Sequence, residues 1–545
     1  MTGEADPGGD LTRTGVVAAG ILMSRVTGFV RTVTVLAALG AGLVGESYNA
    51  ANVLPNAVYD LLLGGVLSSV VVPLLVTARH EHDDGGVAYT QRLFTLTVVA
   101  LVAIGAVSVL AAPLLVSIVA HQLDPAQHDL AVRWARLCLP QIPFYGLGTF
   151  VGAVLNTRGR YAAPAWAPVA NNVIVTGVAA GFLAVVTTAP APASISSAQV
   201  WWIGVGTTTG VIVQTLLLFP ALKGHAALLR PRFDWRHTGL ARTARLSTWV
   251  LVSVLVNQAG LLVVTNLSTA AGTHAAAQRA GHDAGYTVYA SAYQLFQVPY
   301  AVVAVSVLTV LLPRLSTAAA TGRLLQVKTE VSQALRTVAV VLVPAAVGLV
   351  VLGPPLAVVL LAHGHLSPAS ARYIGWVLAV FAVGLVPFTA FQIQTRALYA
   401  LHDARSPALA NAVATGVNIL LDLLLVAVLP ARHQVAGLAL GFSVSYLVAA
   451  AGTTLALRRR LGLLDGRCIL RTHLQLLTAA LAGGLGAVLA TRLTTAAAGP
   501  SGAEGISVAT AAACGIASFL LVSRHLRIAE VAALRTLVRR CLPAR

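Results

Sequence analysis

Two arginines, Arg25 and Arg31, lie inside a long apolar run near the start of the chain. A charged side chain at the centre of a membrane-spanning helix costs roughly 2.5–3.5 kcal/mol or more, so it normally faces protein or a water-filled cavity. Guanidinium groups bind phosphate oxygens in a bidentate manner and stay charged at any working pH. The two arginines therefore predict a cavity that holds an anion. In the alternative interpretation, each arginine snorkels to the interface or pairs with a structural acid.

A second costly pair, Asn418 and Asp422, lies in another apolar run. A spacing of four residues puts both side chains on one face of a helix. Their oxygen atoms suit a hard cation, so the pair predicts coupling to a cation or a proton. The alternative is a hydrogen-bonded polar pair that packs two helices together.

The elements that hold these residues must lie in a membrane. The chain has 545 residues, of which 57% are hydrophobic and 10% are charged, whereas a soluble domain carries about 25% charged residues. The net charge of +18 does not indicate a nucleic-acid partner, because the basic residues lie in short loops between apolar runs, as in cytoplasmic loops of membrane proteins. The four cysteines are scattered, which supports neither a disulfide framework nor a zinc site.

The predicted fold class is an all-α polytopic membrane protein with about 14 transmembrane helices, counted at about 20 residues each. A membrane barrel is disfavoured, because the apolar runs lack the alternation of barrel strands. Most of the 36 lysines and arginines fall in alternate connecting segments, which places both termini in the cytoplasm. The predicted spans are 15–39, 47–78, 93–120, 134–155, 161–187, 200–222, 246–270, 286–312, 329–362, 373–395, 406–430, 435–457, 472–491 and 504–523.

The two halves of the chain resemble each other. Residues 66–78 (VLSSVVVPLLVTA) match 306–318 (SVLTVLLPRLSTA), and 156–164 match 399–407 at a similar offset. The repeat predicts two six-helix lobes with a binding site between them, followed by two extra helices. The predicted divisions are an N-terminal tail 1–14, an N-lobe 15–222, a basic loop 223–245, a C-lobe 246–457, a two-helix region 458–523 and a basic tail 524–545.

Five stretches carry a resemblance to a known family: SRVTGFVRTVTVLAALGAG (24–42), NVLPNAVYDLLLGGVLSSVVVPLL (52–75), and longer matches at 139–172, 397–426 and 435–448. They resemble the MurJ/MviN lipid II flippases of the multidrug/oligosaccharidyl-lipid/polysaccharide exporter superfamily. The resemblance implies a multi-pass protein of the bacterial cell membrane that is not an enzyme. It implies movement of undecaprenyl-diphosphate-linked disaccharide-pentapeptide from the inner to the outer leaflet by alternating access. It also implies no cofactor beyond a coupling Na⁺ or H⁺. The expected partners are lipid II, membrane lipids and cell-wall synthesis proteins, with no nucleic acid.

The family's S-R-x-x-G-F-x-R pattern matches from Ser24 to Arg31, so the resemblance assigns substrate binding to Arg25 and Arg31. It adds Asn56 of the LPN motif and Glu46, which occupies the place of a family acid. Many relatives carry basic residues where this chain has Asp60 and Gln294, so we expect a less positive cavity in which Asp60 pairs with an arginine until substrate displaces it. The alternatives are a structural ion pair for Asp60 and a solvated loop acid for Glu46.

Relatives use the N-x-x-x-D pair for sodium, together with groups on the seventh and twelfth spans. The resemblance therefore makes Thr265 and Ser443 candidate contributors beside Asn418 and Asp422.

Two loops and three other functions stay open. His80-Glu81-His82-Asp83-Asp84 resembles a metal cluster only in composition, and the basic loop 223–245 either sets topology or contacts anionic lipid or substrate. The runner-up function is an exporter of another polyprenyl-linked glycan, or a drug/cation antiporter of the same superfamily. A membrane enzyme is less favoured, because the predicted outer loops are short and poor in acids. A structural scaffold has no use for charges within the membrane.

Overall fold

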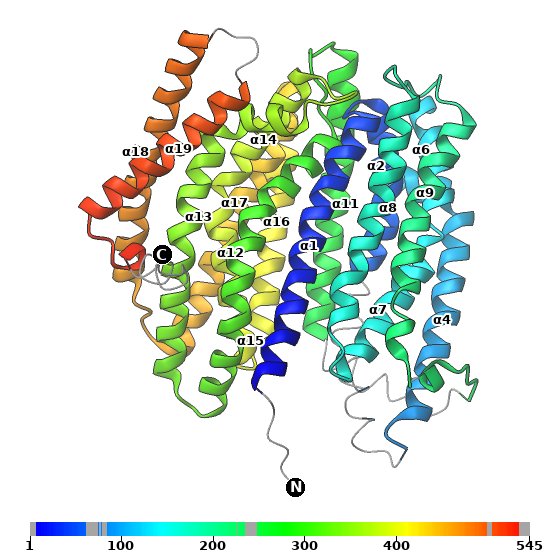
Figure 1. Ribbon diagram of the computed structural model, residues 1–545, viewed down its shortest axis with the longest axis horizontal. Helices are drawn as coiled ribbons and strands as arrows, with labels where there is room; N and C mark the ends of the chain where they lie inside the picture. The colour runs from blue at the N-terminus through cyan, green and yellow to red at the C-terminus, as the bar shows by residue number, and fades with distance from the viewer. Residues whose placement is uncertain are drawn as a thin grey trace. The chain divides into compact units, whose positions relative to one another are not determined.

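The computed structural model describes residues 7–60, 75, 78, 84–224, 226–234, 248–498 and 504–532, and every regular element in these ranges is helical (Figure 1). The all-α prediction is confirmed. Eleven of these helices are long and apolar enough to cross a membrane, or up to 13 spans if each of two bent pairs counts as one. The predicted span 47–78 continues beyond the last described residue of its helix, Asp60, so it is not fully included in that count.

By its contacts the chain divides into two compact units, the first being Met1–Thr273 together with His363–Leu366. Within this unit α1 packs along α8, α8 packs on α9, α2 packs on α6, and α4 packs on α7 (Figure 1). Its helices are α1 (Pro7–Leu39), α2 (Leu43–Asp60), α4 (Val87–Leu110), α5 (Ala112–Val119), α6 (Pro125–Cys138), α7 (Gln141–Thr157), α8 (Ala162–Val185), α9 (Ser197–Leu216), η2 (Pro220–Leu222), η3 (Ala226–Leu229) and most of α11 (Thr248–Ala277).

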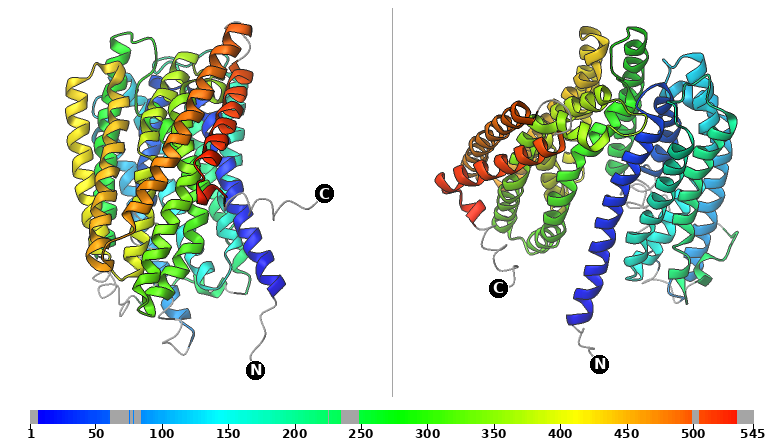
Figure 2. Two further views of the ribbon diagram at one scale, coloured as in Figure 1. Left: turned by 90° about the vertical axis from the view of Figure 1, so that its left-hand side faces the viewer. Right: turned by 45° about the horizontal axis from the view of Figure 1, so that its top comes forward.

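The second unit is His274–Ala362 together with Ser367–Arg545. In it α13 packs on α14, α16 packs on α17, and α18 and α19 run beside each other and against α13 (Figure 2). Its helices are α12 (Tyr286–Ala320), α13 (Leu324–Leu361), α14 (Pro368–Val383), α15 (Leu385–Ala400), α16 (Arg405–Val428), α17 (Ala431–Leu461), α18 (Gly466–Ala498) and α19 (Glu504–His525).

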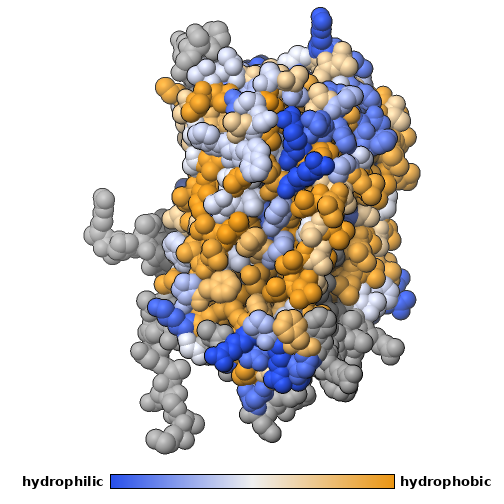
Figure 3. Space-filling view, turned by 90° about the vertical axis from the view of Figure 1, so that its right-hand side faces the viewer, coloured by the Kyte–Doolittle hydropathy of each residue, from blue (hydrophilic) through white to orange (hydrophobic). Residues whose placement is uncertain are grey.

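Small residues allow the helices to approach closely, as is usual where lipid supplies no hydrophobic force between helices. Leu101 of α4 occupies the space that a Cβ at Gly146 of α7 would need. On the face drawn in Figure 3, hydrophobic side chains form a broad zone and hydrophilic ones gather towards its ends. Leu110 and Trp201 are 83% and 60% exposed. A broad apolar surface of this kind marks a face that contacts lipid or another protein rather than water.

Several predicted spans differ from the observed helices. The run 93–120 breaks at Ala111, and 134–155 divides into α6 and α7 around Leu139 and Pro140. The run 373–395 divides into α14 and α15, which bend by 48° at Gly384. At the division between α6 and α7, Pro140 removes a backbone donor. At the bend between α14 and α15, Gly384 has no side chain, which leaves room for Ser443 of α17; the Oγ of Ser443 would lie 2.8 Å from an added Cβ.

The predicted domain boundaries place α11 in the C-lobe, whereas the contacts group α11 up to Thr273 with the first unit. Asn266 Nδ2 donates to Ile118 O at 2.7 Å, and Thr273 Oγ1 donates to Gln122 O at 3.1 Å. The division into lobes stays a prediction. Helix α1 begins at Pro7, inside the predicted tail 1–14. Residues 80–83 of the His-Glu-His-Asp-Asp stretch, 235–245 of the basic loop and 533–545 of the basic tail lie outside the described residues.

Candidate functional site

Helix α1 carries both predicted anion-binding arginines in the first unit. Arg25 is exposed and Arg31 is half-buried, and α1 continues as one helix through Gly28. On an ideal helix a six-residue separation turns the two side chains about 120° apart. Because the helix has no break at Gly28, the two guanidinium groups project from different faces of α1.

Asn172 of α8 fixes the turn of α1 that carries Arg25. Its Nδ2 donates to Ser24 O at 3.0 Å and to Thr27 Oγ1 at 3.1 Å. Gly28 permits this approach, because a Cβ there would lie 3.3 Å from the same nitrogen. The Ser-Arg-x-x-Gly part of the motif is therefore the part that α8 holds in place.

Arg31 lies within electrostatic range of two tyrosine phenols. Its positive charge acts on the phenols of Tyr48 of α2 and Tyr145 of α7. Tyr48 shares a hydrogen bond of 2.9 Å with Thr207 of α9, and Tyr145 donates to Asn56 Oδ1 at 3.3 Å. In the described part of the chain no carboxylate forms an ion pair with Arg31 or Arg25. A fixed cation of this kind is suited to an anionic ligand.

Tyr145 links Asn56 to Arg31, since its hydroxyl bonds Asn56 Oδ1 and the charge of Arg31 acts on its phenol; substrate binding by Asn56 and Arg31 stays a prediction. The ring of Tyr145 also packs against Tyr59 at a tilt of 38°, with 4.7 Å between ring centroids. Asn56 Nδ2 donates to Asn52 O at 2.7 Å. Tyr145 was not predicted as a site residue, although a tyrosine in an apolar span is a detectable signal because its hydroxyl needs a partner.

Neither acid of α2 pairs with an arginine of α1 among the described residues. Asp60 is exposed at the last described turn of α2, so its expected ion pair with Arg25 or Arg31 is not formed in this structure. Glu46 is 3% exposed in the first turn of α2, where the helix dipole stabilises a carboxylate. Its interpretation as a solvated loop acid is therefore wrong, because the helix begins at Leu43 and encloses it.

Asn418 and Asp422 lie one turn apart on α16 in the second unit. Asp422 is 1% exposed. Asp422 Oδ1 and Asn418 Nδ2 are both buried and have no hydrogen-bond partner within the described ranges. Gly441 of α17 faces the pair, since an added Cβ would overlap Asp422 Oδ1 and lie 3.1 Å from Asn418 Nδ2. A buried carboxylate oxygen without a donor fits a cation or a proton, either of which would satisfy it.

The hydroxyl groups of the other predicted ligands form hydrogen bonds with backbone carbonyl oxygens. Ser443 Oγ lies 3.0 Å from both Val380 O and Ala439 O. Thr265 donates to Leu261 O at 2.7 Å and belongs to the first unit. No hydrogen bond among the described residues joins Ser443 to the Asn418–Asp422 pair. Gln294 is half-buried on α12 of the second unit.

An aromatic cluster forms the apolar surroundings of this pair. Asp422 acts electrostatically on Tyr289 of α12, which packs edge-on against Phe381 with 5.0 Å between centroids. Phe442 of α17, next to Gly441, packs on Phe381 at 5.1 Å. Within the described ranges, no three His, Cys, Asp or Glu side chains group as a metal cluster. The oxygen atoms of the pair suit a hard cation, and the carboxylate of Asp422 can also take a proton.

The family model described as "Lipid II flippase MurJ" matches residues 35–503. The chain belongs to the lipid II flippase MurJ family. The matched range contains the motifs of α2 and α16 and confirms the predicted resemblance, and it begins after the Ser24–Arg31 motif of α1. The chain is 29% identical to "Lipid II flippase MurJ" of Burkholderia cenocepacia over 409 residues, covering 74% of this chain and 75% of the relative. It is 26% identical to "Probable lipid II flippase MurJ" of Rhizobium tropici, covering 86% and 85%.

Solved structures show the same fold. A structure titled "Lipid II flippase MurJ, inward closed conformation" matches with a TM-score of 0.74 at 18% identity, covering 94% of this chain and 98% of that chain. An inward-facing multidrug resistance MATE family transporter of the MOP superfamily matches with a TM-score of 0.64 at 14% identity, covering 81% and 96%. At these identities the likeness concerns the fold alone.

Proposed function

We propose that this protein moves lipid II, the undecaprenyl-diphosphate-linked peptidoglycan precursor, from the inner to the outer leaflet of the bacterial cell membrane. Family membership over residues 35–503 is the observation that carries the proposal. The chain is a transporter of this family, with no catalytic step assigned to it. The MATE likeness has the lower TM-score and concerns fold alone, so it supports no second function.

Arg31 is the residue of this chain that fits a diphosphate best. Its guanidinium has no carboxylate partner among the described residues and lies near the hydroxyls of Tyr48 and Tyr145. A diphosphate supplies the missing negative charge, and the phenol and amide groups supply neutral hydrogen bonds to the rest of the headgroup. Arg25 projects from another face of α1 and serves a different stage of the passage, which matches the absence of a break at Gly28.

Asn418 and Asp422 supply the coupling step in this proposal. A cation or a proton at Asp422 Oδ1 would favour the conformation in which that oxygen stays buried, and its loss would favour another conformation. Binding of the ion changes the ratio of the two conformations by no more than the ratio of its affinities for them. The orphaned Oδ1 next to Gly441 is the structural support for this step. Thr265 and Ser443 stay candidate contributors.

Proteoliposomes that contain a fluorescent lipid II in one leaflet test the anion site. Wild-type protein should equilibrate the label between leaflets, while Arg31→Ala should slow the initial rate at least tenfold, the effect of losing a charge-assisted contact of about 1.5–3 kcal/mol. Arg432→Ala is the matched control, because Arg432 is exposed and has no ion pair within the described ranges. Equal rates for wild type and Arg31→Ala would refute the role of Arg31.

The location is proposed with the function. The chain spans a membrane many times, and we propose that both termini and the basic loop 223–245 are cytoplasmic, from the distribution of lysine and arginine. Cell-wall synthesis proteins stay proposed partners.

A further inference from the structure

The segment between α9 and α11 begins as a folded strap rather than as a free linker. We define the strap as residues 220–234, of which all but residue 225 are described. Leu222 of η2 and Leu228 are each 3% exposed and belong to one buried cluster with Leu93 of α4 and Phe150 of α7. The chain reverses at Gly224, whose φ of 81° is in the region that favours glycine. Apolar packing therefore holds the strap on the ends of α4 and α7.

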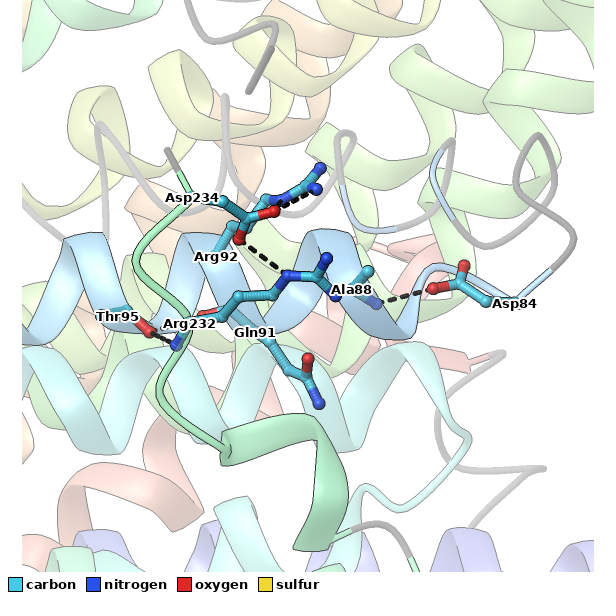
Figure 4. A network of polar contacts seen from close by, with 7 residues as sticks. All are labelled: Asp84, Ala88, Gln91, Arg92, Thr95, Arg232 and Asp234. Carbon is cyan, nitrogen blue, oxygen red and sulfur yellow. Dashed lines mark hydrogen bonds and ion pairs between the residues drawn. The ribbon is translucent and has the colours of Figure 1, made fainter. Parts of the chain in front are cut away.

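Polar contacts clamp the far end of the strap to α4 (Figure 4). Asp234 lies between two arginines: Oδ2 accepts from Arg92 at 2.5 Å and Oδ1 accepts from Arg232 Nε at 2.7 Å. The backbone N–H of Arg232 donates to Thr95 Oγ1 at 2.7 Å. Hydrogen bonds from Arg92, and then from Arg232, hold the pKa of Asp234 well below its ordinary value, so this acid stays ionised.

Asp84 forms hydrogen bonds at the start of α4. Its two carboxylate oxygens accept from the backbone of Gly86 at 2.9 Å and Ala88 at 2.8 Å, which caps the start of α4 (Figure 4). Both described acids of this region are thereby used inside the protein, and neither is directed at an external ligand.

The outward side of the strap is basic and carries one aromatic ring. Lys223, Arg230 and Arg232 are exposed, and Phe233 is 71% exposed. Arg160 reaches the strap from the α7–α8 turn and donates through its Nη1 to the carbonyl oxygens of Ala221 and Lys223. In the described ranges neither Arg160 nor Arg230 has a carboxylate partner. The strap therefore presents fixed positive charge beside the first turns of a predicted membrane span.

We propose that the strap, together with Arg160, is a binding surface for the phosphate headgroups of anionic phospholipids. Basic side chains next to a span attract the anionic lipids of the cytoplasmic leaflet, and an exposed aromatic ring prefers the interfacial layer. Phe233, three residues after Arg230 in the chain, combines both features, whereas the charge of Arg232 is already matched by Asp234. A soluble acidic partner would explain the charge but not the exposed aromatic ring next to it, so lipid is the occupant that this combination favours.

Titration of the purified full chain with phosphatidylglycerol, with bound lipid counted by native mass spectrometry, tests the proposal. The double variant Lys223→Gln/Arg230→Gln should weaken phosphatidylglycerol binding about fivefold for each charge removed. Phosphatidylcholine binding should not change. The matched control is Arg432→Gln/Arg492→Gln, which removes two exposed arginines elsewhere and should leave phosphatidylglycerol binding at the wild-type value.

Two outcomes would overturn the proposal: unchanged phosphatidylglycerol binding in the strap variant, or an equal loss in the control variant. Because no transport is measured, failure here is independent of failure of the proposed flippase function.

Discussion

Replacing Gly441 by alanine should remove ion coupling without changing any charge. The added Cβ would overlap Asp422 Oδ1 and lie 3.1 Å from Asn418 Nδ2. It therefore occupies the space beside the buried oxygen that a cation or a proton donor needs. Because Asp422 is 1% exposed and α17 packs tightly on α16, the pair has little room to move away.

The size of the effect has two parts. Overpacking of a close helix contact should lower the free energy of unfolding by about 1–3 kcal/mol. In wild type, an ion at a hundred times its dissociation constant should raise that free energy by about 2.7 kcal/mol. Gly441→Ala should lose this ion-dependent increment, so its thermal midpoint should be the same with and without the ion.

Thermal unfolding of detergent-solubilised protein, measured in sodium, lithium and potassium salts and across pH, checks this prediction. Gly452→Ala is the control, because it lies on the same helix and its Cβ would meet only Ala410, at 3.3 Å. The control should keep the wild-type response. An ion-dependent increment in Gly441→Ala equal to that of wild type would refute the assignment of the space beside Asp422.

Three further predictions concern contacts outside this pair. Asp403 is buried; although burial opposes its ionisation, hydrogen bonds from Ser406 and the charge of Arg460 lower its pKa below the ordinary value. The ionised carboxylate of Asp403 should therefore stabilise the folded state by about 1–2 kcal/mol above the ordinary pKa of about 3.9, and this contribution should be lost as pH falls through the lowered pKa. The variant Asp403→Asn should have a lower thermal midpoint than wild type at pH 7 and the same midpoint in strong acid. Gly364→Ala should destabilise the chain by at least about 1–2 kcal/mol, because φ is 61° and the Cβ would overlap Ala37 O; Gly348→Ala, with open space around it, should not. Asn172→Ala should slow lipid II transport in proteoliposomes while costing only about 1 kcal/mol of stability; a wild-type rate would mean that holding the Ser24 turn has no role in transport.

The sequence allowed prediction of contacts and faces that depend only on residues a few positions apart in the chain. The four-residue spacing of Asn418 and Asp422 sets their common face, because helix geometry alone decides it. The Ser24–Arg31 motif likewise marks the turn of α1 that α8 holds. The packing of Gly441 against Asp422 was not predictable, since nothing in α16 states which helix covers that face.

The helix breaks likewise include one that a nearby residue signals and one that depends on a distant segment. Pro140 marks the division between α6 and α7, a local signal that a count of apolar residues overlooks. The bend at Gly384 depends instead on the approach of Ser443 from a distant segment. Asp60 was expected beside an arginine of α1 because relatives carry basic residues in this region, but the structure leaves it exposed.

The proposed flippase function is tested by leaflet-resolved measurement of lipid II in cells depleted of this protein. Lipid II should disappear from the outer leaflet and accumulate inside, and wild-type protein and Arg432→Ala should restore it while Arg31→Ala should not. Unchanged outer-leaflet lipid II after depletion, in cells with no second flippase, would contradict the account.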